Sequence, residues 1–293
     1  MSYCIALVHI GSKLPSYLVH TIEQARLFNS CPIILIANQE ALDEAPDLQV
    51  ETIPCESLPR GDAHKRFNTN SKLDKKSRNG FWHYTSERIF YLESLAQTHP
   101  KVSIFHLEND VLLYRSLEEI YPILQNSAIA GTLDNDIRCV PGFLYFRDAP
   151  SLEHLTNFMA DVVGNESFPE INDMILLAAY WRSFGAKAFT PLPVIPSNYP
   201  HPLKSQAGHH PKEPKVFSNG YEQFKSIFDA AALGQYLAGV DPKNSRNQST
   251  VGFLNESALY SADAFEFSWK PTDNGLLVPF AELDGVSIPI NNL

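Results

Sequence analysis

The 293-residue sequence has no apolar stretch long enough to cross a membrane and no excess of basic side chains. Its longest uninterrupted apolar run, Met174–Trp181, has eight residues, whereas a membrane-spanning helix needs about twenty. Lysine and arginine number 23 against 33 aspartate and glutamate, which gives a net charge of −10. A chain this acidic has no overall field that attracts phosphate backbones, so the composition argues against nucleic acid as a partner.

Cysteine is also scarce. The four cysteines, Cys4, Cys31, Cys55 and Cys139, are too scattered for a zinc pattern or a redox pair. The first ten residues contain neither the basic segment nor the cleavage site of a secretion signal. The sequence therefore predicts reduced thiols and a cytoplasmic protein.

The order of apolar segments predicts an α/β fold. With 44% hydrophobic residues, the chain can form one large core and is short for two domains. Strands are predicted at residues 4–10, 32–37, 50–54, 102–107, 129–132 and 140–146, and helices at 15–28, 86–96, 117–124, 151–163, 172–181 and 229–238. Alternating strands and helices are typical of a mostly parallel central sheet flanked by helices.

Two stretches lack periodicity. Residues 60–79 hold seven lysines or arginines and two aspartates, and we expect them to form a long surface loop. The last third of the chain is rich in proline, so an irregular C-terminal part is predicted.

An acidic triplet, Glu108-Asn109-Asp110, follows the strongly apolar segment 102–107. Open α/β sheets bind ligands at the carboxyl ends of their strands. Two carboxylates two residues apart in an extended segment face the same side, where both can meet one divalent cation such as Mg²⁺ or Mn²⁺. The alternative is a polar strand exit with solvated acids.

The segment His106–Tyr114 resembles the Asp-x-Asp metal site of GT-A-fold glycosyltransferases of bacterial and viral type. Glu108 departs from that motif, in which the first acid is Asp. Further similar stretches are Phe81-Trp82, Glu87–Glu93, Asn172-Asp173-Met174, Phe228–Leu237, Gly239–Pro242 and Gly252–Glu256, so that the resemblance covers residues 5–292.

The resemblance implies one GT-A-like domain over residues 1–293, with 1–115 as the half that binds the nucleotide-sugar and 116–293 as the acceptor-binding half. It implies an enzyme, a metal-dependent glycosyltransferase that moves a sugar from a nucleoside-diphosphate sugar to a hydroxyl of a glycan or other acceptor, with Mn²⁺ or Mg²⁺ as cofactor. Asp110 would be the direct metal ligand, and Glu108 would reach the ribose or a metal-bound water.

Asp173 has two interpretations. Asn172 and Asp173 suit a helix N-terminus, where a cap and an acid in the first turn are stabilising. By the resemblance, Asp173 is instead the general base that deprotonates the acceptor hydroxyl, with Glu170 as the other candidate.

A histidine often completes the metal site in this family, but none follows His210 in the sequence. His209 or His210 could serve, or water could take that place. The polar residues predicted to bind the donor are His9, Arg88, Glu108, Asn109, Asp110, Asp229, Gln235, Asn255 and Glu256.

Two other functions stay open. A nucleotidyltransferase usually has a glycine-rich phosphate loop after its first strand, and residues 11–15 (Gly-Ser-Lys-Leu-Pro) are poor in glycine. A protein that kept the fold and binds a nucleotide-sugar or glycan without turnover is the stronger alternative.

Overall fold

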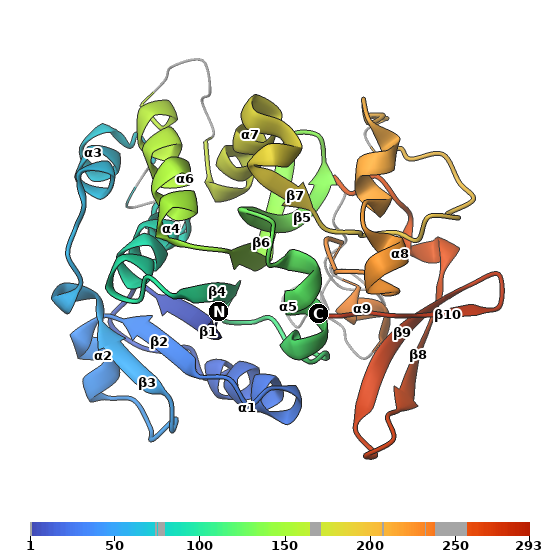
Figure 1. The fold of residues 1–293 in the computed structure, drawn as a ribbon, viewed down its shortest axis with the longest axis horizontal. Helices are drawn as coiled ribbons and strands as arrows, with labels where there is room; N and C mark the ends of the chain where they lie inside the picture. Colours follow the sequence, from blue (N-terminus) through green and yellow to red (C-terminus); the bar gives the residue numbers. More distant parts are fainter. Residues whose placement is uncertain are drawn as a thin grey trace, which may run out of the picture.

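The computed structural model describes residues 2–73, 75, 80–164, 171–206, 208–231, 233–237 and 257–293. A seven-stranded sheet at its centre has the order β3-β2-β1-β4-β6-β5-β7 (Figure 1). Its strands are β1 (Ser2–His9), β2 (Ile33–Ala37), β3 (Glu51–Pro54), β4 (Val102–Leu107), β5 (Ile129–Asn135), β6 (Arg138–Phe146) and β7 (Phe189–Pro191). Only β6 in this sheet is antiparallel to its neighbours, β4 and β5. The prediction of an α/β fold with a mostly parallel sheet is confirmed.

Helices cover both faces of the sheet (Figure 1). The larger ones are α1 (Leu18–Phe28), α3 (Asp62–Asn70), α4 (Phe81–Thr98), α5 (Leu117–Leu124), α6 (Ala149–Val162) and α7 (Asp173–Phe184). Because successive strand residues point to opposite faces, Ala6 and Val8 join the core with α4, α6 and α7, whereas Ile5 and Leu7 join the core with α1 and α5. The continuous apolar runs of the sequence are thus strands buried on both sides.

The chain beyond β7 is less regular, as the proline content predicted. It contains the short helices α8 (Tyr221–Phe224) and α9 (Gly234–Leu237) and a three-stranded antiparallel sheet of β8 (Glu266–Pro271), β9 (Leu277–Leu283) and β10 (Val286–Pro289). A further short helix, α2 (Gln39–Asp43), follows β2. The sequence patterns predicted neither α2 nor the second sheet.

The last residues of the chain return to the central sheet. Leu112 and Leu293 exchange two backbone hydrogen bonds, of 2.7 and 3.0 Å, and the Tyr114 amide donates to the Asn291 carbonyl at 2.8 Å. The segment directly after the acidic triplet is therefore held by the C-terminal residues, a contact that no local pattern indicates.

Two local predictions are wrong. Residues 62–70 form helix α3 rather than part of a surface loop, because Ala63, His64 and Phe67 lie on one side and pack against the core beneath the charged side chains. The predicted helix 229–238 is shortened to α9, because the Asp229 carboxylate accepts the amide hydrogens of Ala231 and Leu233 and so replaces the start of a helix by a turn.

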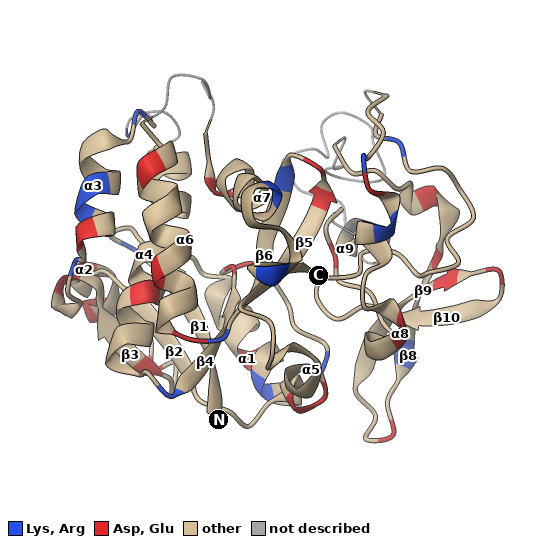
Figure 2. Cartoon of the chain, turned by 45° about the horizontal axis from the view of Figure 1, so that its top comes forward, with Lys and Arg blue, Asp and Glu red and all other residues tan. Residues whose placement is uncertain are grey.

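No helix in the described ranges is long and apolar enough to cross a membrane. Lysine and arginine are scattered among acidic residues in Figure 2 and do not gather on one side of the view.

Candidate functional site

The acidic triplet and the end of β1 meet at one edge of the central sheet. His9 is the last residue of β1, and residues 108–110 follow β4, its parallel neighbour. The Asn109 side-chain amide donates to the Val8 carbonyl at 3.1 Å, and the Thr21 hydroxyl of α1 donates to the Asn109 carbonyl at 2.7 Å. The triplet is therefore fixed to both β1 and α1, at the place where α/β sheets bind ligands.

Arg88 joins two acids that are far apart in the sequence. Its guanidinium comes from α4, is 9% exposed, and donates to Glu108 Oε1 at 2.5 Å and to Asp173 Oδ2 at 3.2 Å. Charged side chains are rarely buried unless they are paired. Sequence reasoning selected all three residues, and the structure brings them together through this guanidinium.

Asp173 is the first residue of α7 and is 3% exposed. The preceding Asn172 caps the helix, accepting from the Ile175 amide at 3.1 Å. Asp173 itself accepts from the Met174 amide at 3.0 Å through Oδ1, while Oδ2 faces Arg88. Burial raises the pKa of Asp173 even though the Arg88 charge opposes that shift. A raised pKa suits a proton acceptor near neutral pH.

Asp110 differs from its two acidic neighbours in being exposed. It forms no ion pair with the described residues, and its pKa is raised by desolvation from the surrounding protein and then by the Glu108 carboxylate. Glu108 and Asp173 pair with the Arg88 guanidinium, whereas Asp110 interacts with its charge only at longer range. When all are ionised, this cluster carries a net charge of −2.

Two buried polar atoms near the triplet have no hydrogen-bond partner: His9 Nε2 and Asn109 Oδ1. Burial lowers the pKa of His9, with a backbone hydrogen bond to Lys13 opposing the shift and Arg88 adding to it. A neutral imidazole and an amide oxygen are therefore available to a ligand or water at this edge.

Tyr17 also belongs to this region, and sequence reasoning missed it. It directly precedes α1 and is 49% exposed. Its pKa is raised by partial burial and then by the carboxylates of Asp110 and Glu108, so the charge of the acidic cluster acts on its hydroxyl. Nothing in the sequence distinguishes this tyrosine from a surface residue, because its proximity to residues 108–110 arises from tertiary structure.

The described residues contain no group of three or more His, Cys, Asp or Glu side chains arranged to hold a metal ion. His209 lies beside Asp136, with Nε2 3.4 Å from Oδ2, and His210 Nδ1 donates to the Leu203 carbonyl at 3.0 Å. Neither histidine is grouped with Glu108 and Asp110, so their roles as metal ligands stay predictions without support from this geometry.

The other predicted donor-binding residues lie in the C-terminal part of the chain. The Asp229 carboxylate is buried and accepts two backbone hydrogen bonds of 2.8 Å, from Ala231 and Leu233. Gln235 belongs to α9, but its side chain is outside the description, as are Asn255, Glu256 and Glu170. Their proposed contacts with the donor stay predictions.

No family model and no curated protein sequence matches this chain. Among solved structures it resembles mouse xyloside xylosyltransferase 1 in its apo form, with 10% identity over 66% of this chain and 86% of that chain and a TM-score of 0.45. It also resembles the PaToxG glycosyltransferase, with 8% identity over 62% and 69% of the two chains and a TM-score of 0.43.

A third resemblance is to the galactosyltransferase LgtC in complex with donor and acceptor sugar analogs, with 10% identity over 60% and 70% of the two chains and a TM-score of 0.42. Each of these three proteins is a glycosyltransferase.

Proposed function

We propose that this protein is a metal-dependent glycosyltransferase that moves a sugar from a nucleoside-diphosphate sugar to an acceptor hydroxyl. The observation that carries the proposal is the cluster of Arg88, Glu108, Asp110 and Asp173 at the carboxyl-end edge of β1 and β4. It combines a buried, oriented carboxylate with an exposed one, at the position where open α/β sheets bind nucleotides.

The charge of the cluster supports a requirement for a cation. A diphosphate is anionic and would be repelled by three carboxylates that share one guanidinium. The side chain of Asp110 is exposed, and its pKa is raised by desolvation and then by the Glu108 carboxylate. A divalent cation would relieve the repulsion between these two carboxylates, with Asp110 and Glu108 as its protein ligands. Mg²⁺ and Mn²⁺ sites of this kind use one or two carboxylates and take their remaining ligands from water and substrate phosphates. Such an ion supplies neutralisation of the charge on the leaving diphosphate.

The residues of the chain would then act on the acceptor. Asp173 takes the proton from the acceptor hydroxyl, and the hydroxyl oxygen forms a bond to the anomeric carbon of the donor sugar. The bond from that carbon to the donor phosphate oxygen breaks, and its electron pair leaves with the nucleoside diphosphate. Arg88 holds Asp173 and Glu108 in fixed orientations, and His9 and Asn109 offer unpaired polar atoms to the donor.

One observation favours binding without turnover as the second candidate. Asp173 is buried, and both of its carboxylate oxygens already accept hydrogen bonds. A base must reach the proton that it removes, so catalysis requires the acceptor to approach Oδ2 beside Arg88, an alignment that many enzymes complete only when substrate binds.

The test is a thermal-shift screen of nucleoside diphosphates with and without Mn²⁺, followed by a transfer assay with the matching nucleotide-sugar. A ligand that binds the native state raises the melting temperature by mass action. We expect one nucleotide to stabilise the protein only with Mn²⁺, and the corresponding sugar nucleotide to be consumed. Stabilisation without consumption in the presence of acceptor glycans would favour the binding protein. The absence of any metal-dependent shift would contradict the proposed metal-dependent transferase.

A further inference from the structure

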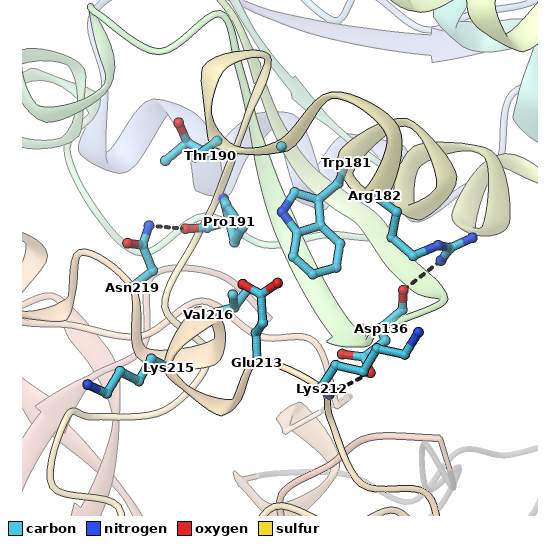
Figure 3. A pocket seen from close by; sticks show the side chains of 12 residues that line it. Asp136, Trp181, Arg182, Thr190, Pro191, Lys212, Glu213, Lys215, Val216 and Asn219 are labelled. Atoms are coloured by element: carbon cyan, nitrogen blue, oxygen red, sulfur yellow. Dashed lines mark hydrogen bonds between the residues drawn. The ribbon is translucent and has the colours of Figure 1, made fainter.

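A second feature of the carboxyl-end edge is a cavity of about 570 Å³ beyond β5 and β7. It is lined by the C-terminal half of α7, the end of β7 and residues 212–219. Figure 3 shows the Trp181 indole projecting into it, with Pro191 on one side and Glu213 and Val216 on the other. The volume is in the range of pockets that bind small molecules.

The wall of this cavity is held together by Asp136, which is 5% exposed at the turn between β5 and β6. Its carboxylate accepts from the Lys212 amide at 2.9 Å and pairs with His209 at 3.4 Å, while its carbonyl accepts from Arg182 at 2.6 Å. These contacts fix α7, the β5–β6 turn and the segment that carries Glu213 relative to one another. The wall of the cavity is therefore held in place by interactions that exist without a ligand.

Several groups that line the cavity have free bonding capacity, including Asp136 Oδ1, which is buried without a partner among the described residues. The Glu213 side chain is exposed and makes no hydrogen bond or ion pair within the described parts of the chain. The Trp181 ring is half-buried, and its indole N–H donates to none of the described residues. An aromatic face can cover the C–H side of a sugar ring while a carboxylate accepts hydrogen bonds from its hydroxyls.

The cavity and the acidic cluster share one edge of the sheet. Because β6 is antiparallel to both β4 and β5, and β7 is parallel to β5, the strands β4, β5 and β7 all end at the same edge. Helix α7 connects the two places, since Asp173 begins it and Trp181 lies eight residues further along. At 1.5 Å per residue, this separation is about 12 Å along the helix axis.

We propose that this cavity binds a neutral saccharide unit of a glycan acceptor, remote from the hydroxyl that reacts, by stacking on Trp181 and hydrogen bonding to Glu213. This inference rests on the proposed function, because only a transferase has an acceptor. The separation of about 12 Å exceeds the reach of a single sugar ring from Asp173, so the saccharide unit bound here is not the one that reacts. It extends that function to glycans of several units and assigns a role to Trp181 and Glu213.

The experiment separates the two sites. The protein is applied, without nucleotide or added metal, to an array of neutral, acidic and amino-sugar oligosaccharides, alongside Trp181→Ala and Glu213→Gln. Phe184→Ala, an exposed aromatic on the same helix that does not line the cavity, is the matched control. Melting temperature and circular dichroism report folding, and calorimetry with nucleoside diphosphate and Mn²⁺ is run separately.

We expect neutral oligosaccharides to bind the protein and Phe184→Ala equally. Affinity should fall at least about tenfold in Trp181→Ala, as for a central aromatic contact, and by a smaller factor in Glu213→Gln. In transfer assays, Trp181→Ala should raise the KM for long acceptors more than for monosaccharide acceptors.

Saccharide binding that is lost in Trp181→Ala while no nucleotide binds would support the cavity and contradict the proposed transferase. If nucleotide binds and saccharide affinity is unchanged in Trp181→Ala, the cavity proposal is contradicted and the proposed transferase is not. Binding of acidic glycans only, or of no glycan, would also overturn it, because the proposal requires a neutral saccharide.

Discussion

Two adjacent residues of α4, Glu87 and Arg88, occupy two different polar clusters. Successive helix residues are rotated by about 100°, and here the rotation turns Glu87 toward α3 and Arg88 toward the carboxyl-end edge of the sheet. Both residues are nearly buried, with 5% and 8% of the whole residue exposed. Their surroundings differ in how far charge and hydrogen bonding are satisfied by the protein itself.

The cluster around Glu87 is largely satisfied within the protein, although His64 Nδ1 is buried without a partner among the described residues. Its carboxylate accepts from His64 Nε2 at 2.8 Å and from the Asn68 amide at 2.7 Å, and His83 Nε2 lies 3.0 Å from Asn68 Oδ1. Phe67 stacks on His83 with the ring centroids 5.2 Å apart. All these residues belong to α3 and α4, so the network joins the two helices and serves stability.

The cluster around Arg88 is open. Its three carboxylates exceed its single positive charge, Asp110 is exposed, and His9 and Asn109 keep unpaired atoms. Unsatisfied polar atoms and uncompensated charge cost stability, and such features concentrate at functional sites. The comparison indicates that mutations around Glu87 change stability and mutations around Arg88 change chemistry. The following predictions test this division.

The largest effect is expected for Asp173→Asn. The amide keeps the shape and can still accept from the Met174 amide, but it cannot take a proton. We expect turnover to fall about 10²–10⁴-fold, with nucleotide affinity preserved and little change in melting temperature. Full transfer activity in this variant would refute the assignment of the base.

Glu87→Ala should destabilise the protein by about 3 kcal/mol or more, because it leaves the buried His64 and the half-buried Asn68 without their partner. Urea denaturation measures the loss. Nucleotide affinity of the folded fraction should match that of the unaltered protein. If Glu87→Ala loses nucleotide binding at urea concentrations too low to unfold it, the division between the two clusters is wrong.

Asp110→Ala should weaken Mn²⁺-dependent nucleoside-diphosphate binding by about 100-fold, or about 2.7 kcal/mol, while stability changes little because the side chain is exposed. Glu108→Ala should weaken binding less. Asp273→Ala, which removes the same charge from an exposed turn between β8 and β9, is the matched control. Calorimetry that finds equal affinities for Asp110→Ala and Asp273→Ala would exclude the predicted metal site.

The smallest effect concerns pH. Burial lowers the pKa of His83, with Glu87 opposing this shift and Lys75 and His64 adding to it. As the pH falls below about 6.5, the unfolded chain therefore binds a proton at this residue that the folded chain excludes, and stability declines by up to about 1.4 kcal/mol per pH unit. Below about pH 4.5 the lowered pKa of Glu87 adds a loss of the same sign.

His83→Gln removes the titrating group and keeps an amide that can donate to Asn68. The difference between this variant and the unaltered protein, measured by urea denaturation between pH 7.5 and 5, isolates His83 from the other histidines. We expect a shallower decline in the variant. Parallel curves would show that His83 carries no part of the pH dependence.

The regular elements of the first two thirds were predictable because their cause is local. Segment 102–107 was predicted with its observed bounds, as was helix 117–124, since unbroken apolar runs and helical spacing record burial directly. Helix α3 was missed because Lys65, Arg66 and the other polar residues of this stretch hid the apolar side formed by Ala63 and Phe67. The β8–β10 sheet was missed because its strands are half exposed and short.

Sequence by itself determined the α/β alternation, the position of the acidic triplet at a strand end, and the cap of α7 at Asn172, because each depends on residues close together in the chain. Tertiary structure alone decided that Arg88 bridges Glu108 and Asp173, that Tyr17 lies near Asp110, and that His209 pairs with Asp136. The ion pairs among them join positions up to 85 residues apart, such as Arg88 and Asp173. Their formation depends on the order of the strands in the sheet and on the orientation of α4 about its axis. Local sequence patterns predict neither of these features.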